Sequence, residues 1–209
     1  GKIIHTSDGG DTWTVATTTN AVGQNIFGVS MGDANNGVAV LGGGGKIIYT
    51  SDGGDTWTDA TTTNVSGWTV VRGVSMSDAN NGVAVGQSGT IVYTSDGGDT
   101  WTAATTTNVG TNYMNGVSMS DANNGVAVGA TGTIVYTSDG GDTWTAATTT
   151  NVGTNYIFGV SMSDANNGVA VGGSGQIVYT GSASSEESTT EEEKESSSDT
   201  CYDCEAPKL

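Results

Sequence analysis

The chain has 209 residues, of which 34 are glycine and one is proline, and its 22 acidic and 5 basic residues give a formal net charge of −17. Glycine and β-branched residues disfavour helices, so the composition predicts an all-β protein of strands joined by tight turns. Nucleic-acid binding depends on lysine and arginine that neutralise phosphates, which argues against a nucleic-acid partner. No apolar run approaches the roughly 20 residues of a spanning helix, so we expect no membrane insertion.

One eight-residue segment, T-S-D-G-G-D-T-W, occurs four times without change. Its tryptophans, Trp13, Trp57, Trp101 and Trp144, are 44, 44 and 43 residues apart, and the methionines of a V-S-M segment repeat at 45, 43 and 43. A period in the low forties with four short strands per unit is typical of β-propeller blades, and a β-solenoid is the main alternative. Residues 1–181 are therefore predicted to form a β-propeller of about four blades. Its repeat units lie near residues 1–19, 20–63, 64–107, 108–150 and 151–181.

The first residues of the sequence fall inside one repeat unit, and the last repeat residues fall inside another. Residues 2–4 and 13–19 are expected to be third and fourth strands, and three complete units follow. In the last of these the expected strands are 113–119, 125–129, 133–137 and 144–150. Residues 156–162, 168–172 and 176–180 then supply three more strands. The sum of 17 strands is one more than a closed four-bladed ring uses. A fragment of a larger ring, a displaced terminal strand and two chains joined edge to edge all remain open.

The two ends differ from the repeats. The chain begins at Gly1 within a repeat, so we expect a processed or truncated N-terminus, and the lack of a visible secretory signal excludes nothing. Residues 182–209 are rich in serine and glutamate and are predicted to be a disordered acidic tail. Within it, Cys201 and Cys204 form a C-Y-D-C motif. A local disulfide, free thiols and intermolecular cross-linking are the alternatives, because a zinc site would need two more ligands.

The repeated octapeptide has a structural role that follows from its residues. Its first aspartate is expected to accept bonds from backbone N–H groups of its own turn, while the paired glycines adopt positive φ and the tryptophan packs back across the hairpin. A carboxylate saturated in this way is a weak base, so a catalytic or cation-binding role is the less favoured alternative. The residues concerned are Asp8, Trp13, Asp52, Trp57, Asp96, Trp101, Asp139 and Trp144.

The octapeptide resembles the Asp-box, or BNR repeat, of sialidase-like propellers. Together with N-N-G-V-A-V-G and I-V-Y-T-S-D-G-G, it is also similar to repeats of the photosystem II stability and assembly factor family. This resemblance covers roughly residues 1–180. It implies a lumenal or periplasmic seven-bladed propeller that chaperones a membrane-protein subunit and docks it through a basic patch. We therefore expect an extracytoplasmic location, whether secreted, periplasmic or lumenal.

The residues that catalysis would need are scarce. Sialidases hold a substrate carboxylate with three arginines, whereas Arg72 is the sole arginine here, and His5 is the sole histidine. His5 occupies a strand position that is tyrosine in the other copies, namely Tyr49, Tyr93, Tyr136 and Tyr179. We predict a non-enzyme without a cofactor or an assigned metal site. A glycoside hydrolase-like Asp-box protein remains an alternative.

The turns are expected to separate onto two rims. The D-A-N-N-G and S-D-G-G-D turns share one acidic rim, where carboxylates could hold Ca²⁺ weakly or be merely solvated, and where N-N-G is expected to supply positive φ. The other rim carries the connections from strand four to strand one, in which the copies diverge. Variable loops on a rigid scaffold are typical of binding surfaces, although neutral drift gives the same pattern.

The candidate contact residues on the variable rim are aromatic, amide and arginine side chains, which contribute strongly to binding when they are desolvated. They are Trp68, Arg72, Tyr113, Asn115 and Tyr156. The sequence therefore predicts a non-catalytic propeller that binds a protein or a glycan. The alternatives are an assembly factor like those of photosystem II and a structural protein that self-associates through its edge strands.

Overall fold

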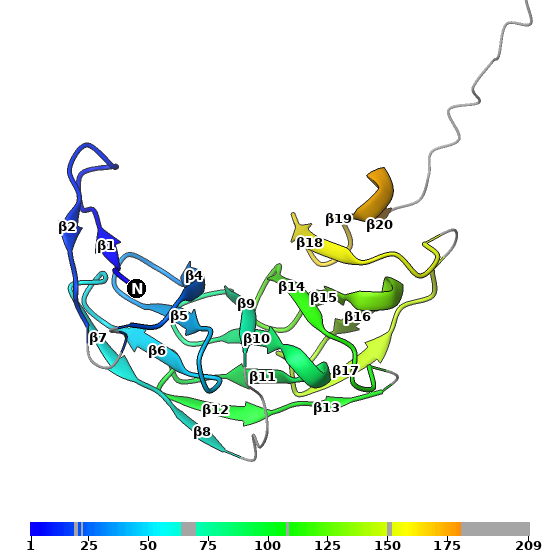
Figure 1. Cartoon of the computed structure of the whole chain (residues 1–209), viewed down its shortest axis with the longest axis horizontal. Coiled ribbons are helices and arrows are strands. Elements are labelled where there is room, and N and C mark those ends of the chain that lie inside the picture. Colours follow the sequence, from blue (N-terminus) through cyan, green and yellow to red (C-terminus); the bar gives the residue numbers. More distant parts are fainter. Residues whose placement is uncertain (19–20, 22, 64–69, 108, 150–151, 181–209) are drawn as a thin grey trace, which may run out of the picture.

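A computed structural model describes residues 1–18, 21, 23–63, 70–107, 109–149 and 152–180. These residues form 20 β-strands in five sheets, with three single turns of 3₁₀ helix. The sheets stand side by side around an open arc, and the first and last sheets lie at its two separate ends (Figure 1). The predicted all-β propeller architecture is confirmed in the form of a partial propeller.

The sheets are numbered here as blades in chain order. The first blade contains β1 (Ile4–His5) and β2 (Thr14–Val15). The second contains β4 (Ile26–Met31), β5 (Gly37–Leu41), β6 (Ile47–Thr50) and β7 (Thr56–Asp59). The third contains β9 (Val71–Met76), β10 (Gly82–Gly86), β11 (Ile91–Thr94) and β12 (Thr100–Ala103). The fourth contains β14 (Met114–Met119), β15 (Gly125–Gly129), β16 (Ile134–Thr137) and β17 (Thr143–Ala146). The fifth contains β18 (Ile157–Met162), β19 (Gly168–Gly172) and β20 (Ile177–Thr180). The 3₁₀ turns are η1 (Gln87–Gly89), η2 (Ala130–Gly132) and η3 (Gly173–Gly175).

Each blade is an antiparallel meander whose two sides have different side chains. In the third blade, Val83 pairs with Tyr93 and Val85 pairs with Ile91. Side chains alternate along a strand, so paired residues two apart lie on the same side of the sheet. We call this side, with two valines, an isoleucine and a tyrosine, the forward face, because it packs against the next blade along the chain.

The opposite side of each blade, its rear face, packs against the preceding blade. In the fourth blade, Met119, Ala127, Val135 and Trp144 form one buried cluster with the forward face of the third blade. Trp144 is 1% exposed, and full burial of such a ring stabilises the fold by roughly 2–3 kcal/mol. The core therefore lies between blades, which is why a single blade cannot be stable alone.

Hydrogen bonds also join neighbouring blades near the concave side of the arc. The backbone N–H of Met119 donates to the hydroxyl of Ser75 in the preceding blade at 3.0 Å. The same bond joins Met76 to Ser30 at 2.9 Å, and Met162 to Ser118 at 3.0 Å. The serine of each V-S-M segment thus helps to fix the position of the first strand of one blade relative to the first strand of the next.

Three short strands on the convex side were not predicted. They are β3 (Thr17–Thr18), β8 (Thr61–Thr63) and β13 (Thr105–Thr106). Each continues from one unit and pairs in parallel with the fourth strand of the next blade, as Thr62 does with Trp101. The complete blades are consequently five-stranded. The predicted fourth strand over residues 144–150 was too long, since β17 ends at Ala146.

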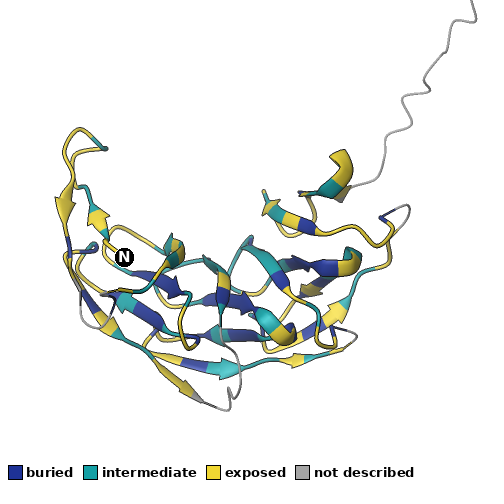
Figure 2. Ribbon diagram, viewed as in Figure 1, coloured by how far each residue is buried: buried dark blue, intermediate teal, exposed yellow. Residues whose placement is uncertain are grey.

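The two ends of the arc are far more exposed than its centre, as the yellow segments in Figure 2 show. Trp57, Trp101 and Trp144 are buried as predicted, but Trp13 is 56% exposed, because none of the described residues packs over its hairpin as a preceding blade does elsewhere in the arc. The N-terminal strands do not complete the last blade, so closure into a four-bladed ring is not observed. No helix among the described residues is long and apolar enough to cross a bilayer.

Candidate contact surface

The Asp-box turns have the predicted geometry. In the third blade, Thr100 donates to the Asp96 carboxylate through its backbone N–H at 2.9 Å and its hydroxyl at 2.5 Å. Thr94 also donates its hydroxyl to Asp96, and Trp101 Nε1 donates to the carbonyl of Gly98 at 2.9 Å. Both glycines of every box have positive φ, as Gly98 does at 96°. The aspartate, the two threonines and the tryptophan thus stabilise one conformation of the hairpin.

The same bonds weaken the box carboxylates as bases. The hydroxyl of Thr56, followed by its backbone N–H, lowers the pKa of Asp52 from 3.8 to about 2. Thr12 likewise holds the pKa of Asp8 well below its usual range. Burial at Asp96 acts in the opposite direction, but the bonds from threonine outweigh it and leave the pKa lowered. These carboxylates remain ionised at neutral pH, which disfavours acid catalysis.

The D-A-N-N turns are built differently from the prediction. Positive φ occurs neither at their asparagines nor at the glycine that follows, for example Gly82. Instead, Asp78 Oδ1 accepts bonds from the backbone N–H groups of Asn80 and Asn81 at 2.7 and 2.8 Å. In the three blades with 3₁₀ turns, positive φ occurs within those turns, at Ser88, Thr131 and Ser174 and at the glycines that follow them.

The two kinds of acidic turn lie on one rim, as expected. Gly97 of an Asp-box donates its N–H to the carbonyl of Asn80 at 2.9 Å, and equivalent bonds occur in the second and fourth blades. The first aspartate of each box and the aspartate of each D-A-N-N turn are engaged within their own turns. No three His, Cys, Asp or Glu side chains gather as a metal site in the part of the chain that the structure describes.

On the forward faces of the second and third blades, a tyrosine reaches the acidic rim of the next blade. Tyr93 donates its hydroxyl to Asp142 at 3.1 Å, and burial, followed by this bond, raises the pKa of Tyr93. His5 takes the same place in β1, and its Nε2 lies 3.8 Å from Asp55 of the next blade. His5 is therefore a strand residue in the tyrosine position, as the sequence predicted.

The variable rim brings several predicted contact residues together. Arg72, at the start of β9, places its guanidinium carbon 5.6 Å from the centre of the Tyr113 ring, which is a cation–π contact between two blades. Both side chains are exposed. Asn115, on β14, is half-buried and donates its Nδ2 to the carbonyl of Ile157 in the fifth blade at 2.9 Å.

Aromatic side chains extend this surface over neighbouring blades. Tyr156 stacks on Phe158, with 6.2 Å between ring centres and 22° between ring planes. Phe158 occupies in β18 the position that Asn115 and Arg72 occupy in their own first strands, and Phe27 occupies it in β4. Both phenylalanines are exposed, although the sequence analysis did not select them. Their shared place in the repeat was the signal that could have identified them.

The remaining predicted residues have no structural description. Trp68 falls in the gap between residues 63 and 70, and Cys201 and Cys204 lie with the predicted acidic tail beyond residue 180. Their predicted roles stay predictions.

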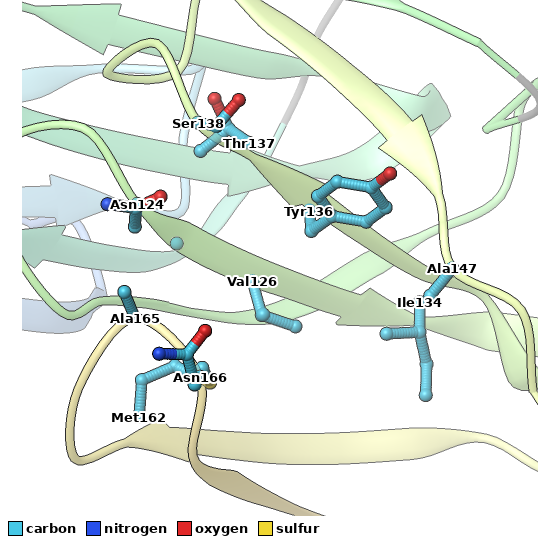
Figure 3. A pocket seen from close by; sticks show the side chains of 11 residues that line it. Asn124, Val126, Ile134, Tyr136, Thr137, Ser138, Ala147, Met162, Ala165 and Asn166 are labelled. Carbon is cyan, nitrogen blue, oxygen red and sulfur yellow. The ribbon is translucent and has the colours of Figure 1, made fainter. Parts of the chain in front are cut away.

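A cavity of about 350 Å³ opens at the forward face of the fourth blade. Figure 3 shows Val126, Ile134 and Tyr136 of this blade on one side, with Met162 and Asn166 of the fifth blade opposite. The lining is mainly apolar, and Tyr136 is 46% exposed. The cavity lies where the fifth blade, within the described residues, has no fourth strand.

Meanders stacked around an arc, with an Asp-box hairpin joining the third and fourth strands in the first four blades, define this chain as an Asp-box (BNR) repeat β-propeller. It is similar to the photosystem II assembly factor family: a family model described as photosynthesis system II assembly factor YCF48 matches residues 66–151. A search of curated proteins finds no match to the sequence.

Solved structures resemble this fold at low sequence identity. YCF48 bound to D1 peptide is 22% identical with a TM-score of 0.59 over 77% of this chain, which spans about half (51%) of that protein. The GH74 enzyme of Niastella koreensis is 22% identical with a TM-score of 0.53, covering 74% of this chain and 28% of the enzyme. The computationally designed Ika4 protein is 16% identical with a TM-score of 0.59, covering 78% and 94% of the two chains. At these identities the likeness concerns the fold.

Proposed function

We propose that this chain is a non-catalytic propeller scaffold that binds an extended protein segment through its variable rim. The observation that carries the proposal is the exposed cation–π pair of Arg72 and Tyr113, with the stacked rings of Tyr156 and Phe158 at the start of the adjacent fifth blade. Three consecutive blades contribute to this surface. Aromatic and arginine side chains contribute strongly to binding once a partner removes them from water, and fixed strands hold them with little loss of entropy.

The chemistry of the surface favours a peptide with both apolar and acidic side chains. Arg72 is the sole arginine of an acidic chain, so it offers one defined position for a carboxylate. The YCF48 structure is described as bound to a D1 peptide, which supports a peptide ligand for a propeller of this kind. A role like that of the photosystem II assembly factors, in an extracytoplasmic compartment, is the more specific form of the proposal.

A glycan is the alternative ligand, because exposed aromatic rings also stack on sugars and GH74 enzymes share the fold. A hydrolase-like activity is less supported, since the first aspartate of each box is engaged in its own turn. We also propose self-association, because both ends of the arc expose apolar sheet surface.

Direct binding measurements test the rim. A fluorescent D1 peptide, its scrambled counterpart and a panel of oligosaccharides are titrated against the full chain and against Tyr113→Ala with Arg72→Ala. We expect selective peptide binding that weakens at least tenfold in the double variant, about 1.4 kcal/mol. Thr111→Ala, in the same exposed loop, is the matched control and should bind as the original chain does.

Two results would contradict the proposal. Equal affinity of the double variant and the original chain would remove the rim as the site. Binding of an oligosaccharide but not of the peptide would establish the glycan alternative.

A further inference from the structure

The forward face is buried wherever a complete blade follows it. In the second and third blades its strand-two valines, Val38, Val40, Val83 and Val85, are fully buried against the next blade. In the fifth blade the equivalent Val169 and Val171 are 46% and 47% exposed, and Ile177 is 68% exposed. The C-terminal end of the arc therefore presents an apolar surface whose usual cover, within this chain, is a rear face of the same repeat.

The cavity beside this end lies where a tryptophan packs between complete blades. In the interior of the arc, Trp144 packs on Val83, Ile91 and Tyr93 of the preceding forward face. The equivalent residues one blade later, Val126, Ile134 and Tyr136, line the cavity of Figure 3, together with Ala147. The fifth blade has no described fourth strand to supply the next ring. We call this cavity the tryptophan socket.

The N-terminal end of the arc exposes an unburied tryptophan and apolar side chains that are buried in the other blades. Trp13 keeps its box geometry, with Nε1 donating to the carbonyl of Gly10 at 3.1 Å, yet it is mostly exposed. Val29 is 60% exposed and Met31 is 43% exposed, whereas the equivalent Met76 is only 7% exposed. In the first blade, two strands that would cover Val29 and Met31 are lacking from the described residues.

We propose that a second copy of the chain joins the two ends, with Trp13 of one copy filling the tryptophan socket of the other. In the same contact, Val169 and Val171 cover Val29 and Met31 of the other copy. Each of these side-chain contacts repeats one that successive blades already make within the chain. Tyr136 then meets Asp11 of the other copy, as Tyr93 meets Asp142.

The joined ends form one shared blade. β18 and β19 supply its first two strands, and β2 of the other copy supplies its fourth. Both β20 and β1 of the other copy could be the third strand of the shared blade, which has room for one of them. β20 pairs with β19 at four residues, whereas β1 pairs with β2 at two, so we assign the third-strand position to β20.

The strands of the described residues limit a closed ring to one or two copies, and the open arc of a single copy favours two. The described residues of each chain form three complete blades and half of two shared ones, so two copies of this arc closed head to tail contain eight blades. Rings of four to eight blades are typical of propellers, and a ring of three chains would exceed that range. This inference is independent of the peptide-binding proposal, because it uses the ends of the arc and not its variable rim.

Light scattering and sedimentation of the full chain test the inference. We expect twice the mass of one chain at micromolar concentration, and a Trp13 emission that shifts to shorter wavelength on association. Trp13→Glu and Val169→Lys each change an exposed residue at a different end, and each should weaken association at least tenfold. An equimolar mixture of these two variants retains one intact junction and should form dimers that neither variant forms alone.

Tyr113→Glu is the matched control, an exposed residue on the variable rim that should leave the dimer intact. Circular dichroism confirms that each variant is folded. A single-chain mass at 100 times that concentration overturns the proposal, and so does a Trp13→Glu variant that dimerises normally. A single-chain mass with Trp13 shielded from a soluble quencher would show instead that the chain closes on itself.

Discussion

At the scale of single residues, a threonine hydroxyl turns a potentially reactive carboxylate into a structural one. The hydroxyl of Thr56 donates to Asp52 at 2.5 Å, and a second bond comes from its backbone N–H. Both stabilise the ionised form, so the free energy that lowers the pKa also stabilises the folded hairpin. The motif itself was sufficient to predict this role.

The lowered pKa values predict how stability depends on pH. The unfolded chain takes up protons near the ordinary pKa of 3.8, while folded Asp52 does so only near pH 2. The stabilisation is therefore fully present above about pH 5 and is lost as the pH falls from 4 towards 2. Asp8, Asp96 and Asp139 shift in the same direction.

Thermal unfolding followed by circular dichroism between pH 2 and 8 measures this dependence. We expect a constant Tm from pH 8 to 5 and a steep decrease below pH 4. Repeating the series in high salt removes the contribution of the net charge, because salt screens exposed charges. A Tm that stays unchanged down to pH 2.5 would contradict the assignment.

The contact residues were predicted less completely than the boxes. Arg72, Tyr113, Asn115 and Tyr156 were selected because their loops vary, and the structure brings Arg72 onto Tyr113 across a blade boundary. Phe158 was missed because it looks like an ordinary strand residue in I-F-G-V-S-M. Phe158 lies at the irregular register between Ile157 and Gly159, a position that is recognised only when the copies are compared with one another.

At the scale of strands, the sequence predicted the antiparallel strands of each meander but not the parallel strand pairs between successive units. β15 was predicted with its observed limits, Gly125–Gly129, because turn residues bound it on both sides. The parallel pairing of β8 with β12 was not predicted, since Thr61–Thr63 could equally have extended the preceding strand. Parallel partners lie nearly one repeat apart and leave no alternating pattern of their own.

The serine bonds between first strands make a testable contribution to stability. Ser75→Ala removes the acceptor for the backbone N–H of Met119, a bond of 3.0 Å, and leaves that donor unpaired between two blades. We expect a loss of about 1–3 kcal/mol in the free energy of unfolding, measured with urea.

Ser161→Ala is the matched control for this measurement. Ser161 holds the same position in the fifth blade, which no further described blade follows. Its replacement should cost less than about 0.5 kcal/mol in dilute solution. Equal losses for the two variants would mean that the bond between blades contributes nothing specific.

At the scale of the whole molecule, stability is expected to follow position along the arc. Each blade contacts only its neighbours, so the central blades have two stabilising interfaces and the terminal ones have one. The repeat period predicted the blades, but not that the arc stays open, because the rotation from one blade to the next depends on interface packing that a strand count does not contain.

Hydrogen exchange followed by mass spectrometry measures this gradient at concentrations too low for association. We expect the slowest exchange in β10 and β15 and the fastest in β1 and β2, because local opening requires less free energy where fewer apolar contacts are lost. At higher concentration, protection should rise at the two ends alone. Uniform protection along the chain in dilute solution would contradict this account.

The short parallel strands have a further consequence on the convex side. A fourth strand without them would present a free row of N–H and C=O groups, which is a template for amyloid-like growth. β3, β8 and β13 cap that row on three successive blades, with Thr61 donating its N–H to the carbonyl of Asp99 at 2.8 Å. The free edge of each of these sheets then falls on a strand of two or three residues, and we expect so short an edge to be a poor template for polymerisation.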